Sequence, residues 1–143
     1  MRETTVERMR ACLVFLALSF LGLFLLPLLS ALFARLVLGA PVRLGLVQIV
    51  LIGQIVPHFL FGVLLGVAAS FLLRKSRMVS VLSVALVGTV ELIQMIAFLN
   101  GNFGLISLWS LASWFIAISG AWLAAYATTM ARARGKDDMS IGE

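Results

Sequence analysis

Long apolar segments, each about the length that a helix needs to cross a bilayer, constrain this chain more than any other feature of its sequence. A transmembrane helix takes about 20 predominantly apolar residues, and we predict spans at about 11–34, 57–73, 78–99 and 105–130. With 62% apolar and only 12% charged residues, the chain has too little polar surface to cover a soluble globule. The sequence therefore predicts an all-α integral membrane protein, a four-helix transmembrane bundle in a single domain over 1–143, with a polar tail at 131–143.

The apolar segment that ends near residue 73 is too long for one untilted span, and Pro57 divides it. One interpretation makes 44–56 an interfacial or partly inserted helix and begins the second span at Pro57, where the missing backbone donor costs nothing. The alternative is a single long kinked helix, in which 44–56 extends the second span. Pro27 is expected to kink the first span, because a mid-helix proline removes a backbone hydrogen bond.

The distribution of basic residues predicts the orientation of the bundle. Nine of the eleven lie in the N-terminal arm, the turn after the second span and the tail: Arg2, Arg8, Arg10, Arg74, Lys75, Arg77, Arg132, Arg134 and Lys136. The positive-inside rule then places both termini in the cytoplasm, in a multi-pass protein of the cytoplasmic (inner) membrane. The first apolar segment is too long for a signal peptide and lacks an A-x-A-type cleavage site, so we predict an uncleaved span.

Glu91 is the only acidic residue inside an apolar segment, since the other five lie at the polar ends of the chain. A carboxylate at the centre of a membrane helix costs roughly 2.5–3.5 kcal/mol, so it normally takes a partner or a proton. Gln94 lies one turn further along the same face, and His58, the only histidine, lies near the start of the second span. We predict Glu91, Gln94 and His58 as ligand-binding or proton-binding candidates in the outer half of the bundle. The supporting polar residues are Gln54, Asn102, Ser107 and Ser110.

A purely structural role for these polar groups is the alternative, because interhelical hydrogen bonds also hold membrane helices together. Small residues at three- and four-residue steps in the last span predict close helix packing: Ser110, Ser113, Ala117, Gly120 and Ala124. The usual enzyme signatures are absent from the sequence, which inclines the prediction against an enzyme and against a cofactor. A single cysteine provides no disulfide or cysteine metal site, and we predict no metal and no nucleic-acid partner.

Two stretches together resemble the VanZ-like family. Residues 57–62, PHFLFG, with Leu65 and Gly66, are similar to the family's span that opens with His-Phe and continues to Leu-Gly. Residues 91–94, ELIQ, are similar to the E-x-x-Q of the next span. The chain departs from the family pattern elsewhere. Gln54 and Ile55 stand in place of an aspartate-lysine pair, and Asn102 and Ser107 in place of a loop arginine and aspartate.

The resemblance implies a diverged member with a role in the cell envelope, such as resistance to glycopeptide antibiotics. Its partners would be membrane lipid and a lipid-linked envelope precursor or a glycopeptide drug. Two further hypotheses stay open from the sequence. One is a small proton-coupled transporter, and the other is an accessory or assembly subunit of a larger membrane complex.

Overall fold

The computed structural model describes residues 5–39, 45–73, 76–98 and 105–140, which are almost entirely helical. The elements are α1 (Thr5–Leu38), α2 (Leu46–Val50), the π-helical turn η1 (Leu51–Ile55), α3 (Val56–Leu72), α4 (Ser76–Phe98) and α5 (Leu105–Ser140). Four helices are long and apolar enough to cross a membrane, and the described part of the chain contains no strand. The predicted all-α four-helix architecture is therefore confirmed.

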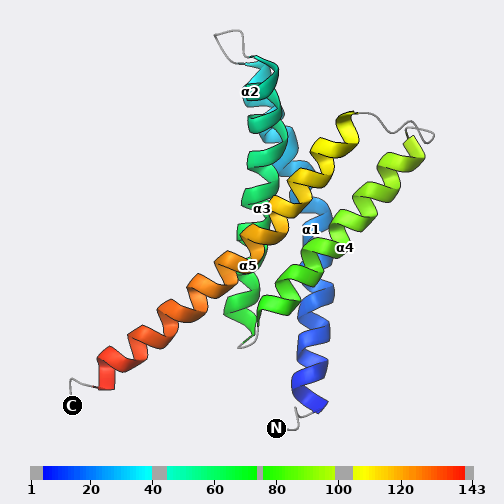
Figure 1. Ribbon diagram of the computed structural model, residues 1–143. Helices are drawn as coiled ribbons and strands as arrows, with labels where there is room; N and C mark the ends of the chain where they lie inside the picture. Colours follow the sequence, from blue (N-terminus) through cyan, green and yellow to red (C-terminus); the bar gives the residue numbers. More distant parts are fainter. Residues whose placement is uncertain (1–4, 40–44, 74–75, 99–104, 141–143) are drawn as a thin grey trace.

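The four long helices run alternately up and down (Figure 1). The start of α1, the end of α5 and the passage from α3 to α4 lie at one end of the bundle, which we call the terminal end; the opposite end is the distal end (Figure 1). Five of the described basic residues belong to helix segments at the terminal end: Arg8, Arg10, Arg77, Arg132 and Arg134. The arrangement thus gathers on one end the positive charge that is scattered along the sequence.

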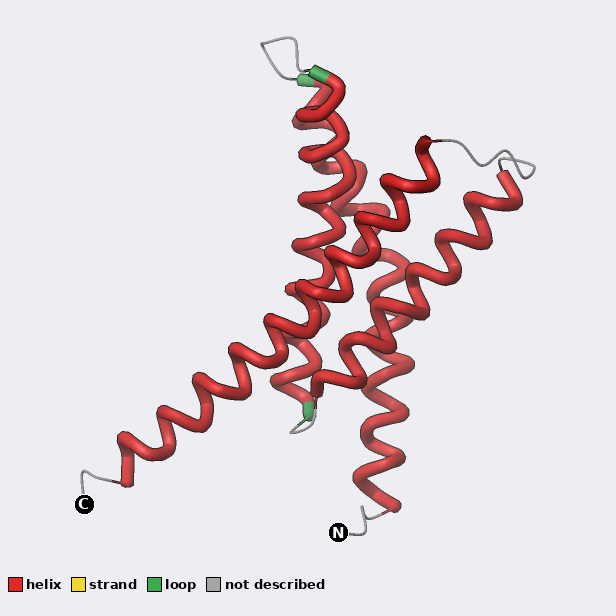
Figure 2. The backbone as a smooth tube through the Cα atoms, viewed as in Figure 1, coloured by secondary structure: helices red, strands yellow, loops and turns green. Residues whose placement is uncertain are grey.

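The helix that contains Pro57 is continuous, with α2, η1 and α3 following one another without a break from Leu46 to Leu72. The helical backbone thus runs unbroken past Pro57, the residue that divides the segment in the sequence. The backbone N–H of Val56 bonds to the carbonyl of Leu51, five residues earlier, as in a π-helix. A proline ring would clash with the carbonyl four residues before it in a regular α-helix, and the wider π turn just before Pro57 avoids this conflict. The tube of Figure 2 shows the helix continuing through this region.

Two other helices run further than the predicted spans. Helix α1 continues through Pro27 as a single element. Helix α5 extends through most of the segment predicted as a polar tail and ends at Ser140. The first four residues of this continuation, 131–134, are alanine and arginine, which are good helix formers.

Helix α3 lies at the centre of the bundle, in contact with α1, α4 and α5. Gly62 and Gly66, spaced as in a G-x-x-x-G motif, face Ala117 and Ala121 of α5. A Cβ on Gly62 would run into the backbone carbonyl of Ala117, so only glycine permits this approach. The close contact fixes the position of α3 along α5. The buried apolar residues around it are Leu18, Leu26, Phe61, Leu65, Ala69, Val84, Val87, Trp114, Ala117 and Ala121.

Candidate functional site

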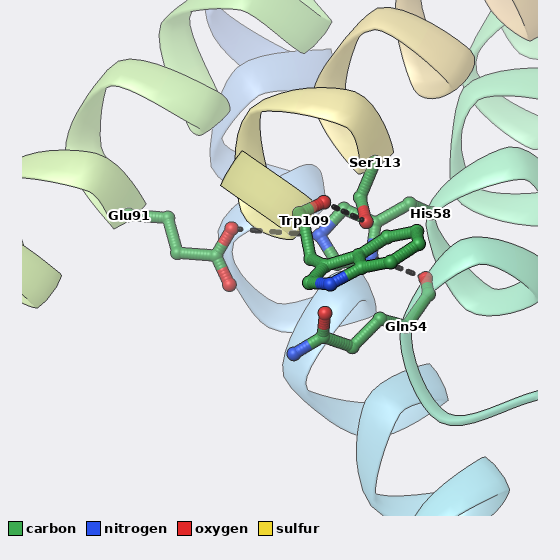
Figure 3. Close-up of polar contacts among 5 residues, drawn as sticks. All are labelled: Gln54, His58, Glu91, Trp109 and Ser113. Carbon is green, nitrogen blue, oxygen red and sulfur yellow. Dashed lines mark hydrogen bonds and ion pairs between the residues drawn. The ribbon is translucent and has the colours of Figure 1, made fainter. Parts of the chain in front are cut away.

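His58 lies in the first turn of α3, directly after the π turn and Pro57, and is 7% exposed. Its Nδ1 is 2.7 Å from the backbone oxygen of Gln54 (Figure 3). A carbonyl oxygen can only accept a hydrogen bond, so Nδ1 carries a proton and donates it. This assignment leaves Nε2 as the ring nitrogen that meets the rest of the site. The backbone of the preceding turn therefore fixes both the orientation and the tautomer of the imidazole.

Glu91 reaches His58 from α4, and its Oε2 lies 3.6 Å from His58 Nε2 (Figure 3). This is an ion-pair distance, longer than a direct hydrogen bond. An imidazolium at His58 and a carboxylate at Glu91 would form an ion pair at this distance. The contact therefore joins α3 and α4 through two ionisable side chains.

The two members of the pair differ in exposure. The side chain of Glu91 is 43% exposed, whereas that of His58 is 9% exposed. The carboxylate thus forms the accessible side of the site, and the imidazole forms its buried wall. A molecule that approaches the site meets Glu91 first.

Helix α5 closes the site with two tryptophans. Trp114 packs edge to face against the His58 ring, with 5.1 Å between ring centroids, and is 5% exposed. Gly88 of α4 makes room for this indole, because a Cβ there would lie 2.8 Å from the ring. Trp109, one turn nearer the distal end, is 42% exposed. Its backbone oxygen accepts a hydrogen bond of 2.8 Å from the Ser113 hydroxyl (Figure 3).

The side chain of Gln54 contributes an unpaired acceptor next to the pair. Its Oε1 is buried and has no hydrogen-bond partner among the described residues. Figure 3 shows this amide near Trp109, extending toward the side of His58 on which Glu91 lies. A buried acceptor without a partner costs about 1–3 kcal/mol, so a donor from a bound molecule would be stabilised here.

Between the site and the terminal end, the interior of the bundle is mainly apolar. Phe61, Leu65, Val84 and Val87 fill its interior. Three buried serines of this half bond to carbonyl oxygens of their own helices, Ser70 to Val67, Ser80 to Arg77 and Ser83 to Val79, whereas the buried Ser19 Oγ has no hydrogen-bond partner among the described residues. The interior between the site and the terminal end is therefore mainly apolar over the described residues.

Among the remaining predicted site residues, Gln94 does not join the pair. Gln94 is exposed and makes no hydrogen bond to the described residues. Ser110 is partly buried on α5, one turn before Ser113. Asn102 lies outside the described residues, as does the side chain of Ser107. Within the described part of the chain, His58 and Glu91 belong to no group of three potential metal ligands.

Sequence reasoning missed the residues that position the histidine. Trp114, Gly88 and the backbone oxygen of Gln54 hold the imidazole from three sides. The glycine pair Gly62 and Gly66 carried a recognisable signal, because small residues four apart in an apolar helix indicate close packing. The role of Trp114 had no such signal, since it depends on how α4 and α5 meet.

The chain matches no protein-family model, and no curated protein and no solved structure matches it. Its four apolar helices fit a multi-pass membrane protein. The specific role must therefore be argued from the site itself.

Proposed function

We propose that this chain is a diverged VanZ-like protein of the cell envelope, in which the His58–Glu91 pair forms the binding site for an envelope component. The observation that carries the proposal is the 3.6 Å approach of Glu91 Oε2 to His58 Nε2. These residues come from the two separate stretches on which the family resemblance rests. Intramembrane ionisable residues are usually functional, and this pair combines a buried imidazole with an accessible carboxylate.

The chemistry of the site favours a ligand that donates hydrogen bonds. Glu91 offers a half-exposed carboxylate, and Gln54 offers a buried Oε1 without a partner in the described part of the chain. The exposed indole of Trp109 adds an aromatic surface beside these acceptors. Hydroxyl, amide and ammonium groups suit this arrangement. A lipid-linked saccharide-peptide precursor and a glycopeptide drug both carry them.

The proposal places the protein in the cytoplasmic membrane with both termini in the cytoplasm. The gathering of Arg8, Arg10, Arg77, Arg132 and Arg134 at the terminal end supports this orientation through the positive-inside rule. The site, in the distal half, then opens toward the outer leaflet. Envelope precursors and glycopeptide drugs are reached from that side.

The test is survival of a deletion strain on teicoplanin-class drugs. The strain is complemented with wild type, Glu91→Gln, His58→Ala or Glu7→Gln, at membrane levels matched by immunoblot. Glu7→Gln is the control, because it makes the same chemical change in the first turn of α1, at the opposite end of the bundle. We expect wild type and Glu7→Gln to protect and the two site variants to fail. Equal protection by Glu91→Gln, or an unchanged phenotype on deletion, would refute the proposal.

Proton-coupled transport is a second candidate, favoured specifically by the geometry that lets the pair hold one proton. A transporter would release a proton when a cationic drug binds, and Glu91→Gln would abolish the release. Purified protein in weakly buffered detergent solution, with a pH-sensitive dye, measures this directly. Drug binding without any proton release would exclude transport and leave the envelope proposal standing. If Glu91→Gln keeps full function and the protein co-purifies with a larger membrane complex, the pair serves packing in an accessory subunit.

A further inference from the structure

A second feature lies in the other half of the bundle, on the surface between α4 and α5. It is an apolar groove of about 470 Å³, lined by Val81, Ile118, Ser119, Trp122 and Leu123. The Ser119 hydroxyl donates to the backbone oxygen of Phe115 at 2.8 Å, so it is satisfied within its own helix. The groove is open and offers a largely apolar surface between the two helices.

Arg77 marks the end of this groove. It lies on α4 one turn before Val81, on the same face of the helix. Its guanidinium stands over the ring of Tyr126, 4.7 Å from the centroid, and 6.0 Å from the centroid of the Trp122 ring. These two rings stack on each other at 5.6 Å with an interplanar angle of 2°. The aromatic pair thus holds the cation beside the apolar groove by cation–π contact.

The stacking leaves the hydrogen-bonding capacity of Arg77 unused. A guanidinium has five N–H donors, and none of those of Arg77 bonds to a described residue. Arg132, at the same end of the bundle, is different. Its Nη1 donates to the backbone oxygen of Ser70 at 2.6 Å, and its guanidinium covers Phe71. Arg132 therefore stabilises the end of α3, whereas Arg77 is oriented and available.

We propose that the α4–α5 groove binds one anionic phospholipid, with an acyl chain along Val81, Ile118 and Leu123 and the phosphate on Arg77. A fork of donors beside an apolar groove matches a phosphate joined to a hydrocarbon chain. The tryptophan and tyrosine beside the arginine are the residues that favour the membrane–water interface. This inference does not depend on the function proposed for Glu91.

The test is native mass spectrometry of the full chain, purified in detergent and incubated with phosphatidylglycerol and phosphatidylcholine of identical acyl chains. Wild type should retain phosphatidylglycerol preferentially. Arg77→Gln should reduce this preference about fivefold, which corresponds to ~1 kcal/mol for one basic residue at an anionic surface. The matched control, Arg134→Gln, removes the same charge from an exposed position further along α5 and should keep the preference.

Two further variants separate the parts of the site. Arg77→Lys keeps the charge without the planar fork and should give an intermediate preference. Ser119→Leu fills the groove and should lower retention of both lipids. Equal binding of the two lipids by wild type, or an equal loss in Arg134→Gln, would overturn the proposal. A lipid-free dimer that Ser119→Leu abolishes would assign the groove to a second copy of the chain and would also overturn it.

Discussion

The close contact between α3 and α5 sets the geometry of the polar site, and Gly62→Ala tests this directly. The added Cβ would meet the carbonyl oxygen of Ala117 and would lie 2.8 Å from its carbonyl carbon. These are backbone atoms, so no side-chain rotation can relieve the overlap. The two helices must move apart, and His58 on α3 must then shift relative to Trp114 on α5.

The size of the effect follows from a matched comparison with Gly53→Ala. A Cβ on Gly53 meets nothing within 4 Å. Gly62 lies in an α-helix, where alanine gains about 1 kcal/mol of helix propensity over glycine, and Gly53 lies in the π-helical turn. The cost of overpacking at Gly62, about 1–3 kcal/mol, therefore dominates the difference between the two substitutions. We expect Gly62→Ala to lower the free energy of unfolding by that amount relative to Gly53→Ala.

The assay is equilibrium unfolding of the purified protein in mixed detergent micelles with increasing dodecyl sulfate, followed by far-ultraviolet circular dichroism. Gly53→Ala should equal or exceed wild type, and Gly62→Ala should unfold at a lower dodecyl sulfate fraction. Equal midpoints for the two variants would show that α3 and α5 do not approach at Gly62, and the positioning of His58 derived above would then be wrong.

Three other contacts make similar predictions in the same unfolding assay. Gly88→Ala should lower the free energy of unfolding by about 1–3 kcal/mol relative to Gly53→Ala, since its Cβ would lie 2.8 Å from the Trp114 ring; equal stability would contradict that packing. Arg132→Gln should lower the free energy of unfolding by about 1 kcal/mol, because it removes the bond to the Ser70 carbonyl and the positive charge at the end of α3. Arg134→Gln should leave the free energy of unfolding unchanged, and equal effects of the two substitutions would refute the contact. A double-mutant cycle with His58→Asn and Glu91→Gln should give a coupling energy of about 0.6–1.7 kcal/mol, and a value near zero would show that the two side chains do not interact.

The helical architecture was predictable because it depends on a local property, the length of apolar segments. The same property could not decide how the region before Pro57 continues, because proline is compatible with both a helix start and a kinked helix interior. The structure resolves the conflict with a π turn at Leu51–Ile55. The hydrophobicity pattern also did not predict that α5 continues to Ser140, because the end of this helix is polar.

The candidate site was predictable in its residue types and less so in its contacts. Glu91 and His58 could be identified from the sequence because a titratable group in an apolar segment is costly. The structure brings them within ion-pair distance. Gln94 shares the helix face of Glu91 in sequence but is exposed and makes no hydrogen bond to the described residues. The positions of Trp114 and of Gln54 Oε1 depend on the way in which α3, α4 and α5 meet, which spacing along one helix does not determine.

His58 donates from Nδ1 to the backbone oxygen of Gln54 and faces Glu91 with Nε2. The chain has one histidine, so selective ¹⁵N-histidine labelling gives an imidazole spectrum with a single assignment. Nuclear magnetic resonance of the labelled protein in micelles measures the protonation of both ring nitrogens. We predict a protonated Nδ1 in wild type and in Glu91→Gln, with the Nε2 resonance changed by the substitution. A bare Nδ1 opposite a protonated Nε2, or an Nε2 resonance that is identical in the two proteins, would contradict the account.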